Sequence, residues 1–262
     1  MLEKIIFVIL IGIIFSLFLQ PISADTPIKI TISSTMEQII FDGKWTHATE
    51  WKKSSLDSLD YKEPIESIKL RTAHQDNFVY VMINFVSDIT PDEDDFAIIC
   101  FDTNNDKSEI PKLDDFCFKS ILGESEGIVL QGNLEDTNNS FLQINSPEGF
   151  IAISSESDSE DRYSNIPHST YEFRIPTDFI SRQSIYGFYM SAYDSDIDKT
   201  FSWPMNVELG KTDIPNPSMW GEMISPDKSL PEFEWPLLTL IPIMGLVIYL
   251  TKKVNLKFLK DV

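Results

Sequence analysis

The sequence predicts an all-β protein in which two antiparallel sheets pack face to face, as a jelly-roll or immunoglobulin-like sandwich. Eight short segments are rich in β-branched and aromatic residues, and Asp, Asn, Ser, Gly and Pro separate them. No long amphipathic helix interrupts this pattern. The expected sandwich occupies residues 25–224, with an amino-terminal signal segment before it and a carboxy-terminal transmembrane helix after it.

The expected strands follow one another at short intervals along the chain. Their ranges are 28–33, 67–73, 78–85, 95–101, 127–132, 149–154, 170–176 and 186–193. Alternation places Ile68, Leu70 and Thr72 on one face, which is typical of a strand with one solvated face. Segment 78–85 is apolar almost throughout and suits a central strand. The polar stretches 103–115 and 155–165 are expected to be loops.

Residues 1–24 have the pattern of a secretory signal peptide. Lys4 lies in a short polar start, an apolar run covers residues 5–19, and small residues lead to Ala24. We therefore expect cleavage after Ala24. The alternative is an uncleaved membrane anchor, because the apolar run is long for a signal peptide.

Residues 235–251 are expected to form a transmembrane helix. No charged residue occurs from Trp235 to Leu250, and a helix of this length is about 24 Å long, enough to span a slightly thinned bilayer. The tail 252–262 carries four lysines, which places it in the cytoplasm and the sandwich on the extracellular side of a single-pass membrane protein. The alternative is a buried terminal helix of a soluble protein.

The linker 225–234 contains the tripeptide Pro231–Phe233 directly before the apolar segment. This order of PEF, apolar helix and basic residues resembles the archaeal PEF-type carboxy-terminal sorting signals. Glu234 stands where those signals commonly have glycine. The membrane-anchor interpretation does not depend on this resemblance.

The composition argues against two classes of function. A formal net charge of -20 makes nucleic acid an unsuitable partner, because phosphate binding needs clustered Lys and Arg. The three histidines lack metalloprotease spacing, and the chain has neither a Gly-x-Ser-x-Gly motif nor a phosphate-binding loop. We therefore expect no catalysis. Acidic excess suits cation binding, and it equally serves solubility or salt adaptation.

Seven spaced motifs occur in a recognisable order between Ile28 and Ile224. They are FDGKWTHATEW, LRTAHQDNFVYVMINF, ICFDTNNDK, YEFRIP, YGFYMSAYDSD, SWP and NPSMWGEM. This order resembles the family 9 carbohydrate-binding modules and the related DOMON-like haem-binding domains. The resemblance implies a β-sandwich that binds a glycan or another cell-envelope component without catalysis. The alternatives are a haem-binding, DOMON-like electron-transfer domain and a structural envelope protein with no small ligand.

The candidate ligand-binding residues follow from this resemblance. An aromatic ring can stack on a sugar, and the candidates are Trp45, Trp51, Trp203 and Trp220. The alternative for each is packing in the core or at its rim. The DOMON-like resemblance implies haem as a less expected cofactor, held by His74 with Met82 or Met190.

Calcium is the other expected cofactor. Oxygen ligands alternate after two expected strands, at Asp102, Asn104 and Asp106 and again at Asp194, Asp196 and Asp198. The alternative is that these residues only form turns. The two cysteines, Cys100 and Cys117, are expected to form a disulfide in an exported protein, although two separately buried thiols are the alternative.

Overall fold

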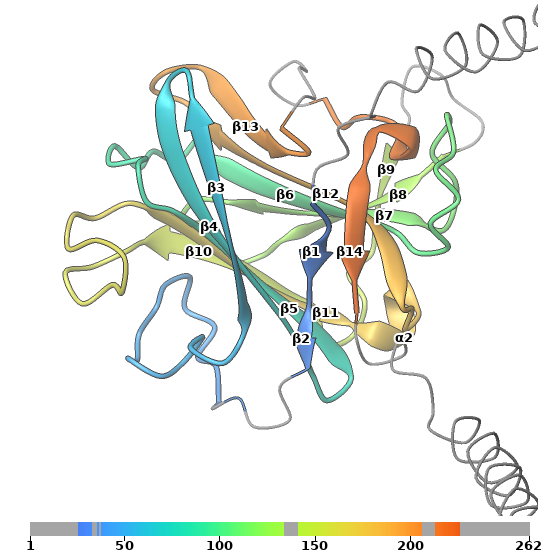
Figure 1. The fold of residues 1–262 in the computed structure, drawn as a ribbon, viewed down its shortest axis with the longest axis horizontal. Coiled ribbons are helices and arrows are strands. Elements are labelled where there is room, and N and C mark those ends of the chain that lie inside the picture. The colour runs from blue at the N-terminus through green and yellow to red at the C-terminus, as the bar shows by residue number, and fades with distance from the viewer. Residues whose placement is uncertain (1–25, 33–35, 37, 134–140, 206–212, 226–262) are drawn as a thin grey trace, which may run out of the picture.

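The computed structural model describes residues 26–32, 36, 38–133, 141–205 and 213–225, and Figure 1 shows them as a two-layer β-sandwich. The expected signal peptide, transmembrane helix and basic tail lie outside the described residues. Within these ranges no helix combines the length and apolar composition that crossing a membrane requires.

One layer is an eight-stranded sheet with the order β1-β14-β12-β6-β7-β8-β9, in which β13 also pairs with β12. In chain order its strands are β1 (Ile28–Lys29), β6 (Phe96–Asp102), β7 (Asp115–Ile121), β8 (Ile128–Gly132), β9 (Phe141–Ile144), β12 (Ile185–Asp194), β13 (Lys199–Trp203) and β14 (Gly221–Ile224).

The other layer is a six-stranded sheet with the order β10-β11-β5-β4-β2, in which β3 also pairs with β4. Its strands are β2 (Thr31–Ile32), β3 (Ser55–Lys62), β4 (Ile65–Gln75), β5 (Phe78–Phe85), β10 (Ile151–Glu156) and β11 (Ser169–Pro176). Two short helices complete the described elements, α2 (Thr177–Ile180) and the 3-10 turn η1 (Pro217–Met219). The predicted two-sheet sandwich is therefore confirmed.

The amino-terminal strand departs from the antiparallel prediction. The described part of the predicted strand, residues 28–32, divides into β1, which pairs parallel with β14, and β2, which pairs parallel with β4. Between them the Ile30 amide donates to the Ile224 carbonyl at 3.0 Å. The segment therefore crosses from one sheet to the other and joins the two layers, as Figure 1 shows at the centre of the molecule.

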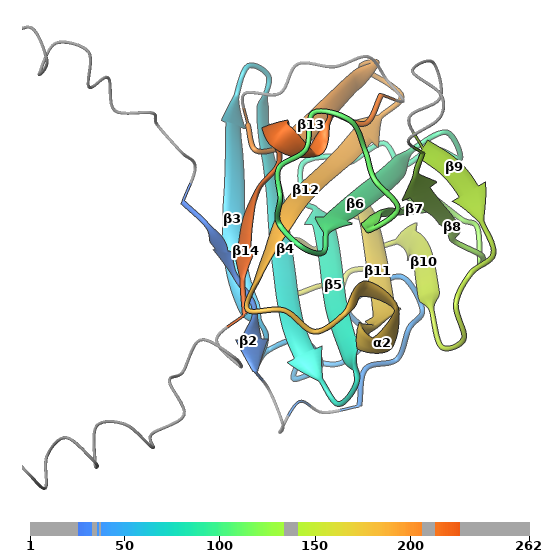
Figure 2. The ribbon, with the colours of Figure 1, turned by 90° about the vertical axis from the view of Figure 1, so that its right-hand side faces the viewer.

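The main core lies between the sheets and follows the alternation of the strands. Val79, Val81 and Ile83 of β5 face Tyr186 and Phe188 of β12 within one buried cluster. Each strand contributes every second side chain to this cluster, because successive side chains point to opposite faces. Figure 2 shows the two layers from the side.

The outer faces of both sheets are also covered by apolar side chains. All seven residues of β6 are buried, and Phe96, Ile98 and Cys100 belong to a cluster on the outside of the eight-stranded sheet. A third cluster, which includes Met82, covers the outside of the six-stranded sheet. Burial on both faces explains why β5 and β6 lack the polar alternation of a half-solvated strand.

The polar stretches predicted as loops are confirmed except at their ends. Residues 103–114 form a loop, and Asp115 already belongs to β7. Residues 157–165 are irregular, whereas Ser155 and Glu156 still belong to β10. Strands β3, β7, β9, β13 and β14 were not expected from the sequence.

The predicted disulfide is confirmed. Cys100 and Cys117 lie opposite each other on the paired strands β6 and β7, with a Cα–Cα distance of 4.1 Å. Both are fully buried in the cluster outside the eight-stranded sheet. The bond therefore links the two strands, β6 and β7, that flank the loop at 103–114.

Replacing both cysteines by alanine should lower the free energy of unfolding by about 3 kcal/mol, because the bond closes a loop of 17 residues in the unfolded chain. Urea unfolding followed by tryptophan fluorescence measures the loss. Reductant should shift the midpoint of the native chain but not of the variant. Equal stability of the two proteins would contradict this account.

Candidate functional site

The four candidate tryptophans are buried and lie in three different clusters. Trp45 and Trp51 belong to the cluster outside the six-stranded sheet, Trp203 to the core between the sheets, and Trp220 to the cluster outside the eight-stranded sheet. Their exposed fractions are between 0 and 4%. None presents an open ring face, so the structure favours the packing alternative over sugar stacking for all four.

Glu172 holds the segment that covers the six-stranded sheet. Its carboxylate accepts hydrogen bonds from the amides of Asp42 and Gly43, at 3.1 and 2.9 Å, and from Trp51 Nε1 at 2.8 Å. Burial raises the pKa of Glu172 well above its ordinary value, and the nearby Glu50 adds to this effect. The carboxyl group is therefore a structural anchor for residues 42–51.

Gly43 of the same segment has to be glycine. Its φ is +84°, and a Cβ there would lie 2.5 Å from the backbone of Ser154 on β10. The turn therefore lies directly against β10 while its amide reaches Glu172. The chain bends at Asp42–Gly43, where only glycine adopts this positive φ without strain.

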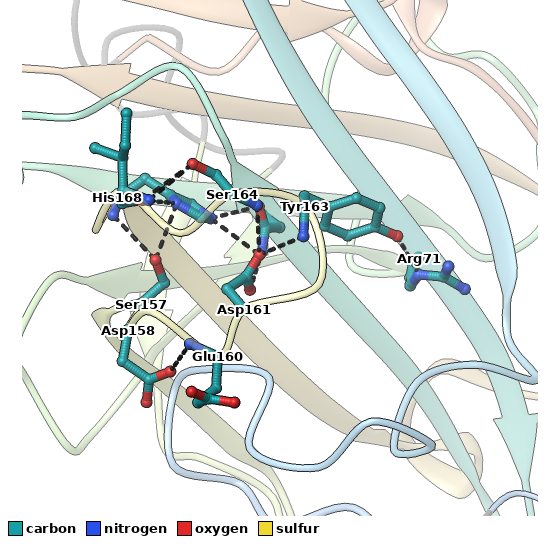
Figure 3. Close-up of polar contacts among 10 residues, drawn as sticks. Arg71, Ser157, Asp158, Glu160, Asp161, Tyr163, Ser164 and His168 are labelled. Atoms are coloured by element: carbon teal, nitrogen blue, oxygen red, sulfur yellow. Dashed lines mark hydrogen bonds and ion pairs between the residues drawn. The ribbon is translucent and has the colours of Figure 1, made fainter.

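Arg71 is a buried cation on the outer face of β4. Its guanidinium lies 5.0 Å from the ring centroid of Trp45 and 5.7 Å from that of Tyr163. Arg71 Nε donates to the Tyr163 hydroxyl at 2.6 Å, and Nη1 donates to the Trp51 carbonyl at 2.9 Å. Figure 3 shows Arg71 and Tyr163 beside a second polar group around His168.

Ser157, His168 and Asp161 resemble a catalytic triad only in composition. Ser157 Oγ lies 2.9 Å from His168 Nδ1, while His168 Nε2 lies 2.8 Å from Asn84 Oδ1 and 3.7 Å from Asp161 Oδ1 (Figure 3). Ser157 and His168 are both buried. A substrate cannot reach the hydroxyl, so these contacts tie loop 157–168 to β5 and do not form a nucleophile.

The structure separates one pair of the haem candidates, and haem binding stays a prediction of the sequence. His74 lies on the side of β4 that faces the core, and its Nδ1 is 3.1 Å from Ser225 Oγ. Met82 belongs to the cluster outside the same sheet, and Met190 is buried in the core between the sheets. His74 and Met82 therefore lie on opposite faces of one sheet and cannot be axial ligands of the same haem.

The first candidate calcium loop is held by its own hydrogen bonds. Asp102 is buried and accepts from the amides of Asp106 and Lys107, at 3.3 and 3.0 Å. Asp106 forms an ion pair with Lys112 at 2.5 Å, and Asn104 donates to Asp106. These bonds are those of a turn closed by carboxylates.

The second candidate loop has the same character. Asp194 is buried and accepts from the amides of Asp196 and Ile197, while Asp198 accepts from the Tyr193 hydroxyl at 2.6 Å. Across the part of the chain that the structure describes, no three His, Cys, Asp or Glu side chains gather as a metal site. Calcium binding stays a prediction of the sequence.

Three buried aspartates lie at the end of the sandwich where β5 ends. Asp88, Asp95 and Asp194 are each at most 5% exposed. Burial raises the pKa of Asp88 to about 7, and the charges of Asp95 and Asp194 add to this effect. Burial likewise raises the pKa of Asp115 to about 7. In their ionised form, Asp88 and Asp115 therefore oppose folding.

The opposite end of the sandwich carries a concave pocket, which we call the α2 pocket. Its volume is about 590 Å³, and its lining includes Asn77, Phe78, Glu148, Pro176, Asp178 and Phe179. Pro147 and Gly149 complete the lining. Figure 2 shows α2 at this end, where β5 begins and β11 ends.

The two aromatic rings of the α2 pocket, Phe78 and Phe179, are half-buried, and each packs against another aromatic side chain. Phe179 packs on Phe116 with 4.6 Å between ring centroids. Phe78 stacks on Tyr80 at 6.3 Å, with 18° between the ring planes. Gly149 has a φ of +83°, and a Cβ there would lie 3.1 Å from Phe78 Cε1. The loop therefore approaches the ring as closely as a glycine permits.

Sequence reasoning missed the α2 pocket. Its residues come from a β-hairpin turn, from the loop before β10 and from α2, so no local spacing brings them together. The Glu148–Gly149 pair before Phe150 indicates only a turn. A second cavity, of about 330 Å³, is lined by residues 125–127 before β8 and by the start of β10, and Phe150 is its aromatic residue.

Asp88→Asn should stabilise the protein at neutral and basic pH. A raised pKa means that the folded state binds the proton more tightly than the unfolded chain, so stability falls as pH rises from about 4 to about 7. At pH 8 the variant should gain on the order of a few kcal/mol, with little change at pH 4.

Urea unfolding at pH 4, 6 and 8 measures this dependence. Asp94→Asn, an exposed neighbour, is the matched control and should keep the native pH profile. An unchanged profile in Asp88→Asn would contradict the assignment of this carboxyl group.

Comparisons with known proteins give structural likeness only. No family model matches the chain, and no curated protein matches it. Among solved structures, the model is similar to a family 9 carbohydrate-binding module from Caldicellulosiruptor kristjanssonii, in complex with glucose and with cellotriose. Identity is 17% and the TM-score 0.43 for both, over 76% of this chain and 95% or 93% of those chains. A Bacteroides uniformis protein gives 10% identity and a TM-score of 0.41, over 75% of this chain and 99% of that chain.

Proposed function

We propose that this chain is a non-catalytic carbohydrate-binding module and that its ligand occupies the α2 pocket. The observation that carries the proposal is the pairing, in one concave site, of two half-buried aromatic rings with exposed polar side chains. Ring faces suit the C–H faces of a sugar, and the polar groups of Asn77, Glu148 and Asp178 suit its hydroxyls. Both rings are fixed by other aromatic side chains, so binding orders little that was mobile.

The proposal places the ligand away from the tryptophans. All four tryptophan rings are buried in three apolar clusters. By contrast, Phe78 and Phe179 reach the surface of a pocket whose volume accommodates a sugar unit. A module of this kind binds by shape and hydrogen bonding, with no covalent step.

Phe78→Leu should weaken glycan binding at least about tenfold, because leucine keeps apolar volume but lacks a flat ring face. Glycan-array screening of the full-length chain identifies a ligand, and calorimetric titration measures its affinity. The chain is kept in a non-ionic polyoxyethylene detergent, because a detergent with a sugar headgroup would compete with the glycan for binding.

Phe141→Leu is the matched control for this substitution. Phe141 is also half-buried and stacked on an aromatic ring, but it lies on β9 and does not line the α2 pocket. Equal binding by Phe78→Leu and the native chain would remove the ligand from this pocket. An array with no binding at all would remove the proposed function.

We also propose that the sandwich is exported and tethered to the membrane by residues 235–251, facing outward. The charge asymmetry of the carboxy-terminal tail and the signal-like start support this arrangement. The disulfide between Cys100 and Cys117 suits a compartment outside the reducing cytosol.

Protease added to intact cells should digest the sandwich and leave the tail at 252–262 protected. Antibodies against each part, used before and after the cells are broken open, measure this outcome. A protected sandwich with a digested tail would reverse the proposed topology.

A further inference from the structure

The α2 pocket contains two carboxylates that the fold does not use. Glu148 lies in the loop before β10 and Asp178 lies in α2, and both are exposed. Neither carboxylate has a hydrogen bond or ion pair with another described residue. Two other acids near the surface, Asp106 and Asp158, are each paired with a lysine. The pocket therefore presents free negative charge.

No basic residue is among the residues that line this pocket. Arg174 is nearby, but its Nε donates to the Gly149 carbonyl at 2.9 Å and its guanidinium lies 4.9 Å from the Phe78 centroid. It also lies 5.5 Å from the ring centroid of Phe41. Arg174 thus supports Phe78 and keeps one positive charge beside the pocket, where two carboxylates and the formal net charge of -20 of the whole chain outweigh it.

Carboxylates combined with aromatic faces favour a cation over a neutral or acidic group. A cation over an aromatic ring contributes about 0.5–2 kcal/mol, and a hydrogen bond to a charged partner about 1.5–3 kcal/mol. A neutral sugar can also donate hydroxyl hydrogen bonds to the carboxylates, but it lacks the charge attraction and the cation–π contact of an ammonium group, whereas an acidic sugar meets like charge.

We infer that the α2 pocket selects a sugar with a free amino group, with the ammonium between Glu148 and Asp178 and the ring against Phe78 or Phe179. This inference rests on the proposed carbohydrate-binding function and names the class of its ligand. An aliphatic amine is protonated at pH 6, so the charge needed for recognition is present there.

The test uses the full-length chain in polyoxyethylene detergent at pH 6 and three soluble hexamers of equal linkage. One is built of 2-amino-2-deoxyglucose, one of its N-acetylated form and one of glucose. The amino hexamer should bind about tenfold more tightly than either of the others, and its advantage should shrink between 50 and 500 mM NaCl.

Glu148→Gln and Asp178→Asn should each reduce binding of the amino hexamer about five- to tenfold and reduce binding of the glucose hexamer less, so that the ratio of the two affinities falls. Both substitutions conserve shape at exposed positions, and thermal unfolding verifies the fold. Glu93→Gln, an exposed acid at the opposite end of the sandwich, is the matched control. If the two pocket variants bind the amino hexamer like the native chain, attraction is due to overall charge and the inference fails.

The outcomes separate this inference from the function on which it rests. Equal or stronger binding of the glucose or N-acetylated hexamer overturns the amino preference and keeps a carbohydrate module. Binding of none of the three hexamers, together with an empty glycan array, overturns both.

Discussion

The constraint on which this structure depends is that both faces of both sheets have to be covered. The sandwich core uses one face of each sheet, and the remaining faces carry their own apolar clusters around Cys100 and around Met82. Strand β6 is buried along its whole length because of this double cover. Apolar side chains on an outer face would cost free energy in water, so irregular segments have to pack over them.

This cover determines where function can lie. Residues 42–51 lie over the six-stranded sheet, held by the buried carboxyl group of Glu172, and loop 157–168 is tied down through His168. This layer buries Trp45, Trp51 and Arg71, whose side chains pack against its other residues. Free aromatic surface is left at the end of the sandwich near α2, where Phe78 and Phe179 reach solvent.

Much of the fold could be predicted from the sequence, because it depends on local alternation. Strands that begin at Phe78 and Tyr186 have strong periodic or apolar patterns. Strand β7 was not predicted, because its residues 115–121 follow a polar loop and begin with an acidic residue. The division of segment 28–33 between two sheets depends on contacts with β14 and β4, which no local pattern contains.

The site was less predictable for the same physical reason. A tryptophan has the chemistry for stacking, but its exposure is decided by what packs over it, and Trp203 lies under residues far along the chain. Glu148 and Asp178 look like any two acids in a chain with 41 of them. Only the turn at Gly149 and the position of α2 bring them to one pocket.

The position of β14 has a mechanical consequence. This strand is the last described strand of the chain, and it lies between β1 on one side and β12 on the other, with its axis along both ladders. A pull directed along β14 would load the hydrogen bonds to both neighbours together. Loading in this shear direction requires several bonds to break at once, whereas a hairpin pulled from its open end loses them one by one. The sandwich is thus built to bear tension at its carboxy-terminal end.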